Sequence, residues 1–235
     1  MHLSILWPTW IIEIRSIQLF ALIITFVAFT SVVALHVTSA LDNSIFLYFR
    51  SLHRSTNVDA VMITVTSFGD VSTLLIVAII ITIIRRTRKM GMIFLTSIVI
   101  ISILVIYIKP IVGRSGPHQK FESALLLPKH FMIEDDSLLP SVRDFSYPSN
   151  HVAVASAFAF IVGFGLNRRS PIAGWIVWSF PIIIAITKLY IMQHYVTDTI
   201  AGCVLGLIVS IVLSNLMGLN KPFSMSRFKG KEHFR

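Results

Sequence analysis

An uncharged, apolar segment near the N-terminus is the feature that most constrains how this chain folds. No charged residue lies between Arg15 and Asp42, and residues 17–37 are mostly apolar. A helix over this segment, rising about 1.5 Å per residue, is long enough to cross a bilayer core of about 30 Å. The whole chain agrees, because 55% of its 235 residues are hydrophobic and only 13% are charged. Soluble domains average about 25% charged residues, so the composition indicates an integral membrane protein.

Further apolar segments cover residues 58–84, 90–108, 151–166, 172–186 and 199–219. The first of these is interpreted as one helix with Asp70 near its outer boundary, at headgroup level or in a local turn. A carboxylate deeper in the membrane would instead mark a functional site. Pro181 predicts a kink in the fifth span. The expected fold class is all-α, a polytopic membrane protein with a six-transmembrane helical bundle and interfacial loop helices.

The same pattern divides the chain into three parts. Residues 1–57 hold an N-terminal anchor, the first span and an interfacial segment that begins at Asp42. Residues 58–219 form the membrane core, and residues 220–235 form a basic tail.

Basic residues gather in three segments that fall on one side of the six predicted spans. They are Arg85, Arg86, Arg88 and Lys89 after the second span, Arg168 and Arg169 after the fourth, and Lys221, Arg227, Lys229, Lys231 and Arg235 in the tail. The positive-inside rule makes that side, and with it both termini, cytoplasmic. The opposite ends of the spans then face the external side of a cell membrane. The net charge of +9 is thereby explained by loops and lipid headgroups, and no nucleic-acid partner is expected.

A histidine and an aspartate stand between the last two predicted spans. His194 precedes Asp198 by four residues, a spacing that puts both side chains on one face of a helix. A carboxylate bonded to one imidazole nitrogen fixes the tautomer and leaves the lone pair of the other nitrogen free to attack. A purely structural contact at a helix end is the alternative for this pair.

A second histidine, His151, opens the fourth predicted span. Ser149 is expected to cap this helix, and Pro148 fixes the backbone that enters it. A helix N-terminus presents free N–H groups and the positive end of the dipole, which suit a phosphate. His151 is placed there to give a proton to a leaving oxygen. An ordinary cap followed by an interfacial histidine is the alternative.

Three cations are expected at the same membrane level, Lys109, Arg114 and Lys188. Contacts with lipid headgroups alone would account for Lys109 and Arg114. Beside an attacking imidazole and a proton donor, however, fixed cations stabilise the charge of a phosphoryl transition state. The external loops show no metal-ligand spacing, and the single cysteine, Cys203, excludes a cysteine-based zinc site. The pattern therefore predicts phosphoryl transfer with no metal and no other cofactor.

These residues resemble the type 2 phosphatidic acid phosphatase superfamily, which includes bacterial acid phosphatases and vanadium haloperoxidases. The resemblance covers about residues 58–215 and has three parts. Lys109-Pro-Ile-Val-Gly-Arg114-Ser-Gly116-Pro117 corresponds to Lys, six variable residues, Arg-Pro. Pro148-Ser149-Asn150-His151 corresponds to Pro-Ser-Gly-His. Thr187-Lys188, five residues, His194, three residues and Asp198 correspond to Ser-Arg, the same intervals, His and Asp.

The resemblance implies a role for each matched residue. His194 would form a phosphohistidine, Asp198 would orient it, and His151 would protonate the leaving group. The residues implied to hold phosphate oxygens, through side chains or backbone N–H groups, are Lys109, Ser149, Asn150 and Lys188.

The chain departs from the family pattern at the phosphate-binding positions. Gly116 occupies the slot of the motif arginine, and Arg114 is expected to supply that charge from two residues earlier, with His118 and Arg143 as alternatives. Lys188 in place of arginine keeps the charge but loses the bidentate fork. Asn150 replaces glycine, and asparagine tolerates the left-handed region better than most residues.

The resemblance implies metal-independent hydrolysis of a membrane lipid phosphate or polyprenyl diphosphate at the external face, with residues 58–219 as the phosphatase core. The expected partners are this lipid and the bilayer, and the oligomeric state is not predicted. A lipid phosphotransferase would use the same phosphohistidine. Gly116 and Lys188 motivate a second alternative, a non-catalytic protein that binds lipid phosphates. A transporter is disfavoured because the cations lie mostly outside the spans and no repeat is seen.

Overall fold

The computed structural model describes residues 12–117, 121, 123–124, 135–136, 140–167 and 170–220. Their secondary structure is helical, apart from one isolated antiparallel bridge between Ser115 and Phe145. The elements in chain order are α1 (Ile17–Ala34), α2 (Ser39–Ser51), α3 (Thr56–Phe68), α4 (Val71–Ile83), α5 (Arg88–Val112), the 3-10 turn η1 (Pro140–Val142), α6 (Asn150–Asn167), α7 (Pro171–Ile176), α8 (Ser179–Tyr190) and α9 (Val196–Leu216). The all-α class is confirmed. Residues 221–235 of the basic tail, Arg168, Arg169 and His118 lie outside the described residues.

The helices account for the predicted membrane spans. Five helical segments are long and apolar enough to cross a bilayer: α1, α5, α6, α7 with α8, and α9. The consecutive helices α3 and α4 raise this number to six if they form one bent span. A polytopic helical bundle is therefore confirmed.

The second predicted span is not one continuous helix, so that expectation is wrong. α3 and α4 meet at an angle of 48°, and the break falls at Gly69 and Asp70. Asp70 has an extended backbone, with φ −61° and ψ 139°. Close packing explains the glycine, because a Cβ at Gly69 would lie 2.6 Å from a side-chain carbon of Ile184 on α8. The break matches the local turn considered for Asp70 and directs this residue toward the bundle.

α6 and α9 pack together at the centre of the bundle, and this contact sets the spacing of the site. Gly202 and Gly206 of α9 face the backbone of α6, where a Cβ would collide with the carbonyl oxygens of Ser149 and Ala153. Small residues at this four-residue interval let two membrane helices approach closely. Near the N-terminal ends of both helices, the N–H of Ser149 donates to the carbonyl of Asp198 at 3.1 Å.

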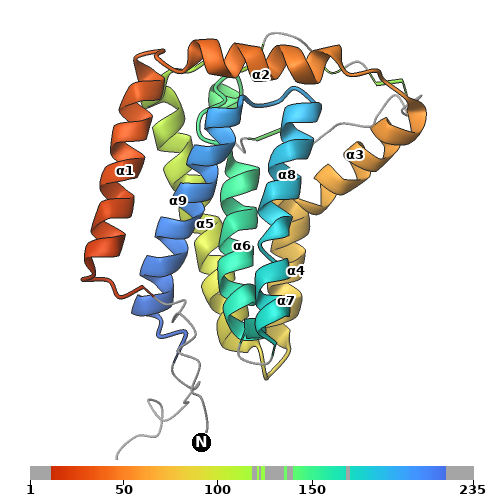
Figure 1. Cartoon of the computed structure of the whole chain (residues 1–235). Coiled ribbons are helices and arrows are strands. Elements are labelled where there is room, and N and C mark those ends of the chain that lie inside the picture. Colours follow the sequence, from red (N-terminus) through yellow and green to blue (C-terminus); the bar gives the residue numbers. More distant parts are fainter. Residues whose placement is uncertain are drawn as a thin grey trace, which may run out of the picture.

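α2 lies across the ends of the upright helices, at the end where α6 and α9 begin (Figure 1). It contacts α8 and α9. The predicted interfacial segment thus forms a helix of its own, but Asp42 in its first turn is buried against the bundle. Many apolar side chains on α1 and α4 are exposed, as expected for surfaces that face lipid.

Candidate active site

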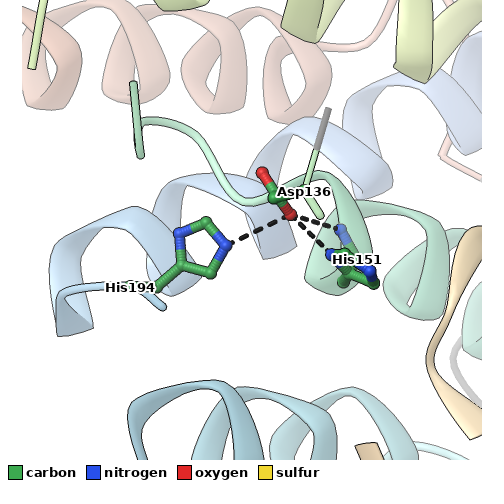
Figure 2. A group of neighbouring side chains, drawn as sticks. All are labelled: Asp136, His151 and His194. Atoms are coloured by element: carbon green, nitrogen blue, oxygen red, sulfur yellow. Dashed lines mark hydrogen bonds and ion pairs between the residues drawn. The ribbon is translucent and has the colours of Figure 1, made fainter. Parts of the chain in front are cut away.

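The carboxylate of Asp136 stands between the two predicted catalytic histidines (Figure 2). Its Oδ1 lies 2.7 Å from Nδ1 of His151 and 3.1 Å from Nε2 of His194. Both histidines are buried, with exposed fractions of 0% and 1%. The structure thus brings together two imidazoles that lie more than 40 residues apart in the sequence, one at the start of a predicted span and one between two spans.

The N-terminus of α6 points backbone donors at the same carboxylate. The N–H of Asn150 donates to its two oxygens at 2.9 and 3.0 Å, and the N–H of His151 donates at 3.1 Å. The hydroxyl of Ser149 donates at 3.3 Å, and its oxygen accepts from the N–H of Val152 at 3.5 Å, so Ser149 caps α6 as predicted. Asn150 begins the helix without a positive φ, so the left-handed turn considered for it does not form.

Lys109, in the last turn of α5, completes the group, and its side chain is fully buried. Its Nζ lies 3.1 Å from Asp136 Oδ2. Burial opposes ionisation of Asp136, but the charges of Lys109 and His194 outweigh it and hold the pKa of this carboxyl well below its usual range. Burial also opposes protonation of His194, yet Asp136 raises the pKa of this imidazole. We call Asp136 with its partners Lys109, Ser149, Asn150, His151 and His194 the Asp136 cluster.

Asp70 and Lys188 border this cluster on the side of α4 and α8. Asp70 Oδ1 lies 3.5 Å from His151 Nε2 and 3.7 Å from Lys188 Nζ. Lys188 is fully buried and donates to Gln193 Oε1 at 3.0 Å. Asp70 thus lies in a local break after Gly69, one of the two placements expected for it, and this break brings its carboxylate to the predicted catalytic histidine His151.

His194 and Asp198 do not share a helix, contrary to the geometry expected from their spacing. His194 precedes α9, and Asp198 lies in its first turn. The chain still brings His194 Nδ1 within 3.7 Å of Asp198 Oδ2, while that oxygen accepts from the N–H of Tyr195 at 2.8 Å. Asp198 therefore fixes the backbone beside His194 as well as facing its ring.

Arg114 has other partners than the phosphate site expected for it. Its guanidinium lies between two carboxylates, 2.6 Å from Asp42 Oδ2 and 2.7 Å from Asp198 Oδ1. The exposed alternative, Arg143, pairs with Asp135 at 3.3 Å.

Sequence reasoning missed three carboxylates of this region, Asp42, Asp70 and Asp136. Asp70 had a usable signal, since a carboxylate inside an apolar segment is costly and marks a functional candidate. Asp136 lies in a long connection with several other acidic residues, and no local spacing distinguishes it from them. Asp42 lies far from the matched motifs in the sequence.

Asp136, His151 and His194 also offer a possible set of metal ligands, because one ligand atom from each lies within 4.8 Å of the others. No metal-ligand spacing was seen in the sequence, because the three residues come from separate segments. The surrounding donors favour an anion over a cation at this place. Two backbone N–H groups and the Lys109 ammonium point to the position of the carboxylate, and each would repel a metal ion.

Comparison with known proteins agrees with this geometry. The sequence matches the family model of the PAP2 superfamily over residues 90–222. An undecaprenyl-diphosphatase of Sulfolobus acidocaldarius is 28% identical over 156 residues, which are 66% of this chain and 68% of that protein. Undecaprenyl-diphosphatase BcrC of Bacillus subtilis is 26% identical over 87 residues, which are 37% of this chain and 43% of that protein.

Two solved membrane proteins share the fold. A transmembrane PAP2 type phosphatidylglycerolphosphate phosphatase from Bacillus subtilis superimposes with a TM-score of 0.69, at 20% identity, over 89% of this chain and 100% of that chain. Aquifex aeolicus LpxE gives a TM-score of 0.54, at 20% identity, over 73% of this chain and 92% of that chain. The family match begins in α5, so it includes Lys109, His151 and His194 but not Asp42 or Asp70.

Proposed function

Because this chain belongs to the PAP2 superfamily of membrane phosphatases, we propose that it hydrolyses a lipid phosphate, with a polyprenyl diphosphate as the first candidate, through a phosphohistidine. The observation that carries this proposal is the Asp136 cluster. Two backbone N–H groups, a hydroxyl, two imidazoles and an ammonium surround a single carboxylate there. A phosphoryl group has the charge and the oxygen acceptors to take the place of that carboxylate.

In the proposed reaction His194 is the nucleophile. A phosphoryl group that replaces the carboxylate of Asp136 lies in front of His194 Nε2, which is 3.1 Å from Asp136 Oδ1. The nitrogen forms a bond to phosphorus while the bond from phosphorus to the leaving oxygen breaks, and His151 gives that oxygen a proton. Water then attacks the phosphohistidine, His151 takes a proton from the water, and His194 is released as free imidazole.

The substrate class is proposed from chemistry and from the relatives. A site at the ends of α5, α6 and α9 suits a headgroup at the membrane surface with its lipid tail beside the exposed apolar faces of the helices. The polyprenyl diphosphate is suggested by the undecaprenyl-diphosphatases among the relatives. We further propose that this end of the bundle is external, because Arg85 and Arg86 lie at the opposite end, between α4 and α5.

Phosphate release by the purified protein in detergent tests the proposal. Polyprenyl diphosphate, polyprenyl monophosphate and phosphatidylglycerol phosphate are offered separately, each with excess chelator. We expect release from the native protein and from His53→Ala, which changes an exposed histidine, and a loss of about 10⁴-fold or more in His194→Ala. The diphosphate should react fastest.

Two further measurements distinguish hydrolysis from lipid transfer and test on which side of the membrane the site lies. Chromatography of the lipid products separates hydrolysis from transfer to a second lipid. In sealed right-side-out vesicles, externally added diphosphate should be hydrolysed. A folded native protein that releases no phosphate from any of the three lipids would overturn the proposed function, and loss of activity with chelator would overturn the metal-free mechanism.

A further inference from the structure

A second buried group of charges lies directly beside the Asp136 cluster. Arg114, in the loop after α5, contacts Asp42 of α2 at 2.6 Å and Asp198 of α9 at 2.7 Å. The side chains of Arg114, Asp42 and Asp198 are 9%, 1% and 0% exposed. Three separate elements therefore meet at one guanidinium group.

Thr197 joins the three charged side chains into one network. Its hydroxyl lies 2.5 Å from Nη1 of Arg114 and 2.8 Å from Asp42 Oδ2, and its N–H donates to Asp42 Oδ1 at 3.1 Å. Asp42 thus accepts a hydrogen bond from a backbone N–H in the first turn of α9, as a helix-capping side chain does. The same turn holds Asp198. The guanidinium stacks over the ring of Tyr195 at 4.4 Å. We call Arg114, Asp42, Thr197 and Asp198 the Arg114 network.

The charge balance of this network argues against phosphate binding by Arg114. One guanidinium faces two carboxylates, so the network carries a net negative charge that would repel a phosphate. Its guanidinium nitrogens Nη1 and Nη2 already donate at 2.5 to 2.7 Å to Thr197, Asp198 and Asp42. Freeing them for a substrate would leave buried carboxylates without a counter-charge, at high cost.

We propose that Arg114 is a positioning residue for Asp198, held in place by Asp42, and that it does not replace the arginine missing at Gly116. Arg114 fixes Asp198 through Oδ1, so that Oδ2 faces His194 Nδ1 and holds the N–H of Tyr195. α2 lies outside the matched family region. Its residue Asp42 is thereby connected to His194 through the side chains of Arg114 and Asp198. This proposal rests on the proposed role of His194.

Gly116 offers a matched test, because the motif arginine can be restored there. A Cβ at Gly116 would lie 3.7 Å from its nearest neighbours, the Asp144 carbonyl oxygen and Ser146 Cβ, and the residue has no positive φ. Arg114→Met, Gly116→Arg and the double variant are compared with the native protein. Arg114→Met should lower kcat about 10-fold or more with little change in KM, and Gly116→Arg should not restore kcat.

The pKa of His194, measured by NMR of histidine-labelled protein in detergent, gives a readout that does not need turnover. Among the described residues, the charged or titratable groups near His194 and Arg114 include Asp136 in the loop with its partners Lys109 of α5 and His151 of α6, Asp42 of α2, Asp198 of α9, and Tyr147 and Tyr195. Arg114→Met removes a positive charge and should raise the pKa of His194 by about half a unit or more. Asp42→Asn removes a negative charge and should lower it.

Opposite shifts from these two variants would show that the Arg114 network acts on His194 in the folded protein, because loss of structure alone would move both in one direction. The proposal is overturned if Arg114→Met raises KM at unchanged kcat, if Gly116→Arg restores the double variant, or if the pKa of His194 moves in neither variant. The thermal unfolding midpoint of each variant checks that the protein remains folded. If the native protein hydrolyses nothing, the proposed function fails, while the NMR shifts still decide whether Arg114 acts on His194.

Discussion

The Asp136 cluster and the Arg114 network lie side by side at one end of the bundle, yet their charges are arranged in opposite ways. In the cluster, one carboxylate faces a lysine, two histidines, a serine and two backbone N–H groups. In the network, one guanidinium faces two carboxylates. In the cluster several donors therefore surround one anion, whereas in the network two anions share one guanidinium.

This difference suggests that the two groups do different work on the same nucleophile. An anion in the cluster can be exchanged, because a phosphate can accept from the same donors as Asp136 does. The network cannot exchange its anions, since Asp42 and Asp198 are part of the helices they connect. Substrate binding and transition-state stabilisation are thus expected from the cluster, and the orientation of His194 is expected from the network.

Among the substitutions that distinguish the Asp136 cluster from the Arg114 network, Lys109→Met should lower kcat/KM the most. It removes the cation nearest to Asp136 Oδ2 while keeping an unbranched side chain in the same buried space. Loss of one fixed charge from a phosphoryl site should lower kcat/KM about 100- to 1,000-fold. Binding of vanadate, measured by calorimetry, should weaken in parallel.

The matched comparison for this change is Arg114→Met, which should leave vanadate binding nearly intact. Equal losses of vanadate affinity in the two variants would show that both cations bind the phosphoryl group, and the distinction between cluster and network would then fail.

The sequence predicted the fold well wherever a local signal was strong. Uncharged apolar segments located the spans, because a bilayer tolerates little else, and the motif spacing located Lys109, Ser149, His151, Lys188, His194 and Asp198. The break at Gly69 and Asp70 was considered only as a local turn, and one helix was expected over residues 58–84. It depends on the close approach of Ile184 from α8, which is a tertiary contact without a local signature.

The partners of the predicted residues were much harder to foresee. Arg114 was expected to bind phosphate, but the pairing with Asp42 depends on how α2 packs over α9. Asp136 is one of several acidic residues in a long connection, and only the fold selects it for the site. Motifs therefore predicted candidate catalytic groups that the fold brings together, while several carboxylates that contact them come from elsewhere in the chain.

Asp136→Asn should tighten vanadate binding, whereas Lys109→Met should weaken it. Asp136 occupies the donors that a substrate phosphate would use, so its carboxylate competes with binding. Removing its charge should tighten vanadate binding about tenfold in Asp136→Asn. The same carboxylate raises the pKa of His194 against the opposing effect of burial, so the pKa of His194 should fall in the variant.

The pH dependence follows from the requirement that His194 attack in its neutral form. The rate falls as the pH drops below the pKa of His194, so a lower pKa moves this acidic limb of kcat/KM to lower pH in Asp136→Asn. Weaker vanadate binding, or an acidic limb that moves to higher pH, would contradict the view that Asp136 competes with the substrate.

Asp70→Asn should have the smallest effect, because Asp70 contacts His151, the proposed proton donor. Its Oδ1 lies 3.5 Å from His151 Nε2, on the opposite side of the ring from the contact between Nδ1 and Asp136. We expect the amide to hold the ring less firmly and to lower kcat about fivefold for a lipid substrate, well below the 100-fold or more that a proton donor itself supplies. For p-nitrophenyl phosphate, whose leaving group departs without a proton, the variant should match the native protein. An equal loss for both substrates would place Asp70 in phosphate binding through Lys188, 3.7 Å away, and would extend the Asp136 cluster to the break between α3 and α4.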